Sequence, residues 1–260
     1  MNINQSDPWS LLDAELDAWH KAGQSAGLWW RDDDAAIPGP KLDQLISISM
    51  HAGLLLAVIP AKSDKSLRKS LSQSSLIRIA QHGYAHINHA PRGQGLGAWE
   101  LGMHRGLDAV LADLDAGRSR LAELFDDYFL PVVVPPWNRI DSALFKPLVD
   151  RGYQAVSTFG ARQSQYWVDG LLAVNAHCDP IRWKTGAKFA GDAKTLTQLV
   201  EHLSARRLGD VDAQEPTGFL THHIDLDNDG WQFCERLATS ISRHPGAHWV
   251  PPADVFRNPL

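Results

Sequence analysis

Short apolar runs alternate with amphipathic segments along most of the chain. The runs have the length of buried strands, and between several of them apolar residues recur at helical spacing. Such alternation predicts an α/β fold with a mostly parallel sheet, and its number of repeats predicts a closed or nearly closed barrel. The expected strands are 28–31, 54–59, 76–80, 131–134, 155–158, 172–175, 219–224 and 248–250, and the expected helices are 41–51, 104–125, 142–151, 195–206 and 231–243.

The chain opens with a further amphipathic segment within residues 1–25. Trp9, Leu12, Leu16 and Trp19 fall at helical spacing after Asp7-Pro8, which is a typical helix start. We expect this helix to pack on a single domain that spans residues 1–260, since a chain of this length commonly forms one α/β barrel.

Composition narrows the classes of partner and compartment. The chain has 30 acidic and 25 basic residues without a basic cluster, which argues against nucleic acid or an anionic membrane surface as a partner. Its longest apolar run, 54–59, is far shorter than the roughly 20 residues of a membrane span. With only two cysteines and no secretion signal, the sequence predicts a cytoplasmic protein acting on a small-molecule or carbohydrate substrate, and it is compatible with a homo-oligomer.

Three histidines follow the expected strand 76–80 directly. His82, His86 and His89 lie where that strand ends, which is where α/β enzymes place their chemistry. The segment therefore predicts a metal site.

Three consecutive carboxylates, Asp32, Asp33 and Asp34, end the first expected strand. Such a cluster is also typical of a solvated loop or a helix N-cap. Crowded carboxylates repel one another unless a cation compensates, however, and an aspartate with two histidines is a familiar set of ligands for a divalent ion. That set leaves coordination positions free for water and a substrate carbonyl.

A histidine doublet occurs in the expected strand 219–224. Because strand residues alternate between faces, Leu220 and His222 point one way and His223 the other. A strand histidine is often a core residue, but a doublet at the mouth of a barrel also suits a general acid. A cysteine nucleophile at Cys178 beside His177 is disfavoured because strand neighbours face opposite ways.

In chain order, five segments resemble the five motifs of the polysaccharide deacetylase superfamily, the NodB-homology or family-four carbohydrate esterases. They cover most of the chain, and their order and placement at strand ends are more specific than any single motif. The segments are Arg31-Asp32-Asp33-Asp34, His82-Gly83-Tyr84-Ala85-His86, Pro135-Pro136-Trp137, Asp179-Pro180-Ile181-Arg182-Trp183 and Leu220-Thr221-His222.

This resemblance implies a distorted (β/α)7 barrel that holds one divalent ion, usually Zn²⁺, and hydrolyses an N-acyl or O-acyl group. By position it implies Asp32 as general base, His222 as general acid, and Asp33, His82 and His86 as metal ligands. It also implies substrate contacts from Pro136, Trp137, Asn138, Trp183 and Leu220, with Leu220 in an acyl pocket.

Two positions depart from the family pattern. Val134 stands where the third motif usually begins with arginine, and Arg182 where the fourth has aspartate. We therefore expect Arg182 or Arg31 to support Asp32, and Asp179 to orient His222. Asp34 replaces a small residue of the first motif, so the carboxylate roles are open to a shift by one, with Asp33 as base and Asp34 as ligand.

The sequence thus predicts a metal-dependent deacetylase of a small N-acetylated, sugar-like compound. A hydrolase of a cyclic amide or imide is the second reading. A third interpretation is a catalytically silent metal- or sugar-binding protein, because the third and fourth motifs are altered.

Overall fold

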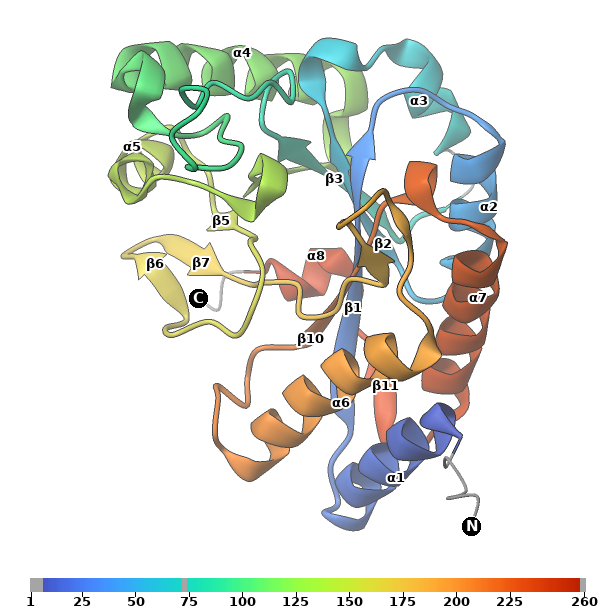
Figure 1. The fold of residues 1–260 in the computed structure, drawn as a ribbon. Coiled ribbons are helices and arrows are strands. Elements are labelled where there is room, and N and C mark those ends of the chain that lie inside the picture. Colours follow the sequence, from blue (N-terminus) through green and yellow to red (C-terminus); the bar gives the residue numbers. More distant parts are fainter. Residues whose placement is uncertain (1–6, 72–73, 258–260) are drawn as a thin grey trace.

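The computed structural model describes residues 7–71 and 74–257. A mostly parallel sheet forms the centre, and the helices surround it (Figure 1). Its strands follow the order β10-β1-β2-β3-β4-β5-β7-β6, in which β6 alone runs antiparallel to its neighbour; β11 pairs with the start of β1. The strands are β1 (Ala26–Ala35), β2 (Leu54–Val58), β3 (Ile77–His82), β4 (Phe129–Val134), β5 (Ala155–Val156), β6 (Tyr166–Val168), β7 (Leu171–Ala173), β10 (Thr217–Thr221) and β11 (Ala247–Trp249).

The segment after β7 joins the two ends of this sheet. Ala176 forms a parallel bridge with Phe159, and Cys178 forms one with Phe219 of β10. The amide of His177 donates to the carbonyl of Gly218 at 2.7 Å, and the amide of Leu220 donates to the carbonyl of Cys178 at 2.8 Å. These bridges bring β10 next to the segment after β7, as in the distorted (β/α)7 barrel that the resemblance implies.

Helices cover the outside of the barrel. In Figure 1, α4 and α5 lie at the top, α2 and α7 along the right side, and α1 and α6 at the base. The helices are α1 (Pro8–Lys21), α2 (Pro40–Ile48), α3 (Lys65–Ser70), α4 (Leu107–Phe125), α5 (Phe145–Asp150), α6 (Asp192–Leu208), α7 (Asn228–Arg243) and α8 (Pro252–Val255). None of the described helices is both long and apolar enough to cross a bilayer.

The opening helix α1 begins as expected, with Asp7 capping the amide of Trp9. Its buried face packs against α6, where Glu15 forms a two-pronged ion pair with Arg207 at 2.8 Å. The sequence pattern did not predict α3, α8, β6 or the short hairpin of β8 (Ile181–Arg182) and β9 (Lys188–Phe189). These elements are too short to produce a clear period.

Two apolar layers follow from the alternation of strand residues. The inner one fills the barrel and is closed by Phe256, whose ring meets Trp29 edge-on. The outer one packs Leu28 and Trp30 beneath the helices. The inner and outer rows of β1 therefore separate residues that are neighbours in sequence.

Candidate active site

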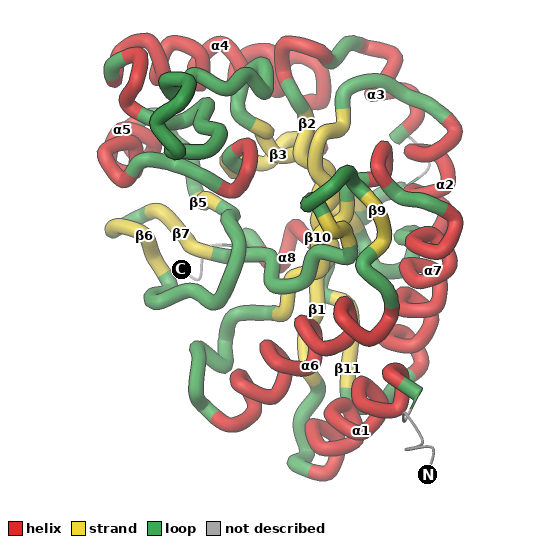
Figure 2. Tube along the Cα trace, in the orientation of Figure 1, coloured by secondary structure: helices red, strands yellow, loops and turns green. Residues whose placement is uncertain are grey.

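A cavity of about 510 Å³ lies at the carboxyl ends of the barrel strands. This is the edge at which parallel barrels carry their active sites. Loops surround it, including the long connection from β3 to α4 that folds beside α4 and α5 in Figure 2. The residues that line the cavity are Asp33, Asp34, His82, His86, Trp137, Asn138, Phe159, Asp179, Trp183 and His222.

The three carboxylates at the end of β1 take three different environments. Asp33 continues the inner row of Trp29 and Arg31, because residues two apart share a face of a strand. Asp32 continues the outer row of Trp30 and is fully buried outside the cavity. Asp32 therefore does not line the cavity, whereas Asp33 and Asp34 do.

Asp34 reaches the cavity through a local distortion of β1. The pairing of β1 with β2 shifts register between Asp32 and Ala35, and Asp34 has a φ of 70°. Left-handed backbone is uncommon for a residue other than glycine and is found at functional sites. The distortion turns the Asp34 carboxylate toward the histidine segment.

Asp34, His82 and His86 converge on one point. Oδ1 of Asp34 lies 3.2 Å from Nε2 of His82 and 3.1 Å from Nε2 of His86, and these ligand atoms lie within 4.8 Å of one another. The sequence had grouped the two histidines with Asp33 instead. In the structure Asp33 faces Arg31, and His89 is not part of the group.

The hydrogen bonding of His82 fits this group to a cation. Nδ1 of His82 lies 2.9 Å from the carbonyl oxygen of Val134. A carbonyl only accepts, so Nδ1 donates and the lone pair of the neutral ring is on Nε2, facing Asp34. Oδ1 of Asp34 is buried without a hydrogen-bond donor. Three acceptor atoms that meet in this way repel one another unless a proton or a cation lies between them, and the group could hold a metal ion.

The pKa shifts of Asp34 and His82 arise from the close approach of these side chains. Burial raises the pKa of Asp34, but the neighbouring His82 and His86 rings outweigh it and hold that pKa well below its usual range. Burial opposes protonation of His82, and the charges of Asp33 and Asp34 still raise its pKa. The carboxylates therefore favour positive charge at this end of the barrel.

A buried glutamate shapes the loop that presents His86. Glu100 is 1% exposed, and its carboxylate accepts backbone N–H groups from Tyr84 at 3.2 Å and Ala85 at 2.8 Å. Gly83 has a φ of 55°, and a Cβ there would lie 1.9 Å from a carboxylate oxygen of Glu100. The glycine of the histidine motif is thus required by this close approach, and Glu100 fixes the turn.

Arg31 holds Asp33 with a two-pronged ion pair. Its Nε lies 2.9 Å from Oδ1, its second terminal nitrogen donates to Oδ2 at 3.0 Å, and both side chains are buried. The guanidinium also donates to Ser157 and to Asn138. Of the two arginines expected to support Asp32, Arg31 pairs with Asp33 instead. Arg182 is exposed on β8 and does not line the cavity.

His222 also lines the cavity. Its ring meets the indole of Trp183 edge-on at a centroid distance of 4.7 Å, and Nε1 of Trp183 donates to Asp179 at 2.8 Å. Burial raises the pKa of Asp179, and the charge of His222 opposes that rise. Asp179 was expected to orient His222 directly. Among the described contacts it reaches His222 through Trp183.

The remaining wall combines predicted and unpredicted residues. Trp137 and Asn138 line the cavity as expected, both with left-handed backbone, and the Trp137 ring lies 4.4 Å from that of His86. Leu220 and Pro136 are buried behind the wall and do not line it. Phe159 was missed, although its place directly after an expected strand is a usable signal. Glu100 carries no local signal, because it lies far from the histidines in sequence.

The other member of the doublet, His223, serves Asp32. Its Nδ1 lies 2.5 Å from Oδ1, and its amide donates to Oδ2 at 2.9 Å. The hydroxyl of Thr221 donates to the same carboxylate at 2.7 Å. His222 and His223 face different partners, but strand alternation is not the cause, because β10 ends at Thr221 and His223 begins a short 3-10 turn instead of continuing the expected strand to residue 224. His223 closes a polar network rather than packing in the apolar core.

A second group of three ligand-type residues lies in the barrel seam. His177, His202 and Glu215 are buried, whereas the sequence indicated no second cluster. Nδ1 of His177 accepts the amide of Gly218 at 2.9 Å, so its neutral ring carries the proton on Nε2, 3.3 Å from Glu215. A metal ligand needs the opposite tautomer. This group is therefore unsuited to a metal, in contrast to His82.

The thiols are unsuited to nucleophilic chemistry. Cys178 and Cys234 are free and buried. Burial raises the pKa of both thiols well above the ordinary value, so the reactive thiolate is disfavoured.

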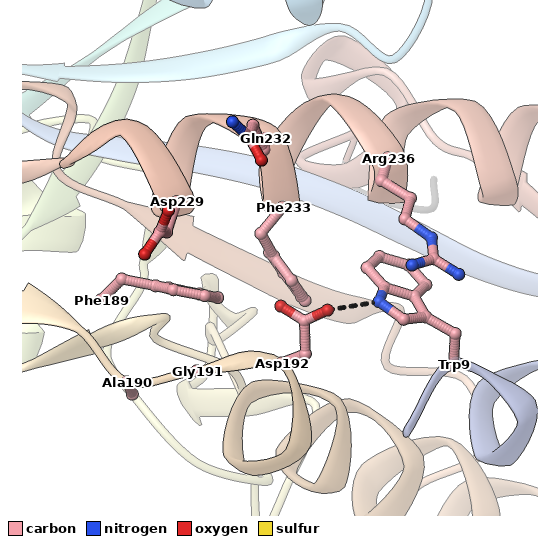
Figure 3. A pocket seen from close by; sticks show the side chains of 9 residues that line it. All are labelled: Trp9, Phe189, Ala190, Gly191, Asp192, Asp229, Gln232, Phe233 and Arg236. Carbon is pink, nitrogen blue, oxygen red and sulfur yellow. Dashed lines mark hydrogen bonds between the residues drawn. The ribbon is translucent and has the colours of Figure 1, made fainter. Parts of the chain in front are cut away.

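Another hollow, of about 450 Å³, lies where α1, α6 and α7 meet (Figure 3). Trp9 donates to Asp192 at 2.6 Å, and its ring packs beside Phe233 and beneath Arg236. The residues that line it include no group of metal ligands. These contacts describe a junction between helices.

Comparisons with known proteins agree on the fold. No family model and no curated protein matches the sequence. Solved structures do match. One described as a putative polysaccharide deacetylase from Mycobacterium smegmatis is 13% identical over 90% of this chain and 89% of its own, with a TM-score of 0.65. The Bc1960 peptidoglycan N-acetylglucosamine deacetylase is 14% identical over 90% of each chain, with a TM-score of 0.56.

A family 4 carbohydrate esterase from Streptomyces lividans, solved with acetate, is 15% identical over 90% of this chain and 98% of its own, with a TM-score of 0.50. The chain thus has the fold of the polysaccharide deacetylases and family-four carbohydrate esterases. The resemblance seen in the five sequence motifs is confirmed at the level of the fold.

Proposed function

We propose that the protein is a metal-dependent hydrolase that removes an acyl group from the nitrogen of a small or sugar-like substrate. The observation that carries this proposal is the convergence of Asp34, His82 and His86 on one point without a hydrogen-bond donor, in a cavity that Asp33 and His222 also line. The fold supports it, because solved structures with the same fold are described as deacetylases and esterases.

The ligand set suits a divalent ion, and we propose Zn²⁺. One carboxylate and two neutral imidazoles are typical of a zinc site that leaves a position for water or substrate. Such an ion would polarise an acyl carbonyl and lower the pKa of water beside it. Val134 holds His82 in the tautomer this requires, and the turn around Glu100 presents His86.

Two residues of the chain would carry out the two proton transfers, Asp33 as the base and His222 as the acid. Asp33 accepts the proton of the attacking water, and Arg31 fixes the orientation of its two oxygens. His222, which also lines the cavity, donates a proton to the leaving nitrogen as the C–N bond breaks. Trp183 and Asp179 position His222, while Trp137 and Asn138 contact the substrate.

Three asparagine variants test this assignment. Asp34→Asn should lose both metal and turnover, because it removes an anionic ligand. Asp33→Asn should keep the metal and lose about 10²-fold or more of turnover, the scale of one proton-transfer group. Asp32→Asn should keep the metal and lower stability, because Asp32 accepts from Thr221 and His223. Elemental analysis and amine release from N-acetylated sugars, polyamines and cyclic amides are the measurements.

The outcomes separate the alternatives. Metal loss in Asp33→Asn with retention in Asp34→Asn would restore the unshifted register. Metal binding without hydrolysis of any amide in the panel would indicate a silent binding protein. Preferential opening of cyclic amides would indicate the second hydrolase class.

A further inference from the structure

The hairpin of β8 and β9 carries one wall residue of the active-site cavity, Trp183, in the turn that follows β8 (β9 is labelled in Figure 2). Trp183 lines the cavity and is also 48% exposed, so its indole lies where the cavity opens to solvent. Its Nε1 donates to Asp179 at 2.8 Å, which holds the indole in place. A substrate that extends out of the cavity past Trp183 therefore meets this hairpin.

Three exposed cations lie on the same hairpin. Arg182 and Lys188 are direct cross-strand partners, and Lys184 lies in the turn between the two strands. Directly opposed residues of an antiparallel pair point to the same face, where like charges repel each other. We call Arg182, Lys184 and Lys188 the cationic hairpin.

None of these three cations forms an ion pair with a carboxylate in the part of the chain that the structure describes. Two carboxylates do contact the hairpin, but they accept other N–H groups. Asp179 accepts the indole N–H of Trp183, and Asp227 accepts the amide of Phe189 at 3.3 Å. An anion bound to the opposed pair would relieve its repulsion.

The cavity itself offers no comparable cation. No lysine or arginine is among the residues that line it, and Asp33, Asp34 and Asp179 add carboxylates to its wall. The net charge of the whole chain is −5, so the positive charge of the hairpin is a local feature. An anionic group of a substrate, apart from the acyl group at the candidate metal ligands, is therefore favoured on the hairpin rather than inside the cavity.

We infer that the cationic hairpin binds an anionic group, a carboxylate or a phosphate, of the substrate whose acylated nitrogen enters the cavity. The inference rests on the proposed function. The acylated nitrogen would lie beside His222, and the anionic group would lie outside Trp183, against Arg182 and Lys188. Arginine and lysine form charge-assisted hydrogen bonds with such oxygens. The substrate class is then an acidic N-acylated, sugar-like compound rather than a neutral one.

Binding of amine products to the Zn²⁺-loaded protein tests the inference without turnover. Calorimetry would compare glucosamine with muramic acid, which adds a carboxylate, and with glucosamine 6-phosphate. Two exposed ion pairs should tighten binding of at least one acidic product about fivefold at low salt. The preference should shrink in about 1 M salt, which screens exposed charges. Equal affinities for all three products at low salt would overturn the inference.

Matched double variants locate the anion. Arg182→Gln combined with Lys188→Gln should bring the acidic and neutral products within about twofold of each other. Lys21→Gln combined with Arg243→Gln is the control, because it removes the same two kinds of charge at exposed ends of α1 and α7 that do not line the cavity. The control should keep the preference. An equal loss in both double variants, or an unchanged preference in the hairpin variant, would overturn the inference.

A kinetic assay separates this inference from the proposed function. The N-acetyl forms of the same three amines would be tested for amine release by the native protein. If none is hydrolysed but the products bind as expected, the proposed function fails and the anion site stands. If all three are hydrolysed equally well and the products bind alike, the proposed function stands and the anion site fails.

Discussion

At the scale of single residues, neighbours within one motif behave differently: of the first segment, Asp33 and Asp34 line the cavity and Asp32 does not. His82, His86 and His222 line the cavity as expected. Asp33 and Asp34 line the cavity in place of Asp32 and Asp33, because Asp32 lies in the outer row of β1 and the bulge after it turns Asp34 toward the cavity. No local sequence pattern reveals that bulge. The row of Trp29, Arg31 and Asp33 on one face of β1 shows which side of the strand faces the barrel interior, which the sequence alone leaves open.

The role of His222 leads to a prediction about turnover. His222→Ala should lower kcat by about 10²-fold and leave the metal bound, because the side chain lines the cavity but does not belong to the ligand group. Steady-state kinetics and elemental analysis measure the two properties. His89→Ala is the control and should retain both, since His89 lies outside the ligand group. Loss of metal in His222→Ala would contradict the assignment.

Arg31 allows a second prediction at this scale. Arg31→Lys removes the fork that holds both oxygens of Asp33 within a buried network, so we expect it to lower the free energy of unfolding by about 2–4 kcal/mol and to reduce turnover. Arg182→Lys, on the exposed hairpin, should change stability by less than about 0.5 kcal/mol. Denaturant unfolding compares them, and similar losses in both variants would refute the assignment to Arg31.

At the scale of elements, strands and long helices were predictable, whereas the loops that shape the site were not. The barrel strands and α1, α2, α4, α6 and α7 follow the apolar periods closely. The turn of residues 83–87 depends on Glu100, which reaches it from a separate irregular segment. A contact between two loops has no period, so sequence reasoning could place the histidines at a strand end but could not explain how they are held.

Glu100 therefore carries the prediction for this element. Glu100→Ala leaves the amides of Tyr84, Ala85 and Ile87 without their acceptor and frees the turn that presents His86. We expect the metal affinity to fall about 10-fold to 100-fold, the range seen when partners of metal ligands are removed. Competition with a chromogenic chelator measures it. Glu123→Ala, an exposed change on α4, should leave affinity unaltered; equal affinity in both variants would disprove the role of Glu100.

At the scale of the whole molecule, the alternation of strands and helices predicted the barrel but not how it closes. The closing segment after β7 forms single bridges rather than a long strand. His177, His202 and Glu215 lie in this seam; the rings of the two histidines stack at 3.4 Å, and Nδ1 of His202 lies 2.9 Å from Thr217 of β10. The stability of the seam therefore depends on two buried histidines remaining neutral.

This dependence predicts acid sensitivity. Burial, with the charges of His177 and Arg206, lowers the pKa of His202 from 6.5 to about 2, and burial also lowers that of His177. Below pH 6.5 these two histidines become protonated in the unfolded chain but stay neutral in the folded chain. Stability is therefore fully present above about pH 6.5 and falls as the pH is lowered toward 2, by up to about 1.4 kcal/mol per pH unit for each group.

His202→Gln isolates this contribution because it keeps a polar side chain beside Thr217 without a titrating ring. Urea unfolding at pH 7, 6 and 5 should show a shallower loss of stability in the variant than in the native protein, with a difference of about 2 kcal/mol accumulated between pH 6.5 and pH 5. His20→Gln, at an exposed position of α1, should reproduce the native slope. Parallel pH curves for the native protein and His202→Gln would show that the seam does not carry the acid sensitivity, and that another part of the barrel limits its stability.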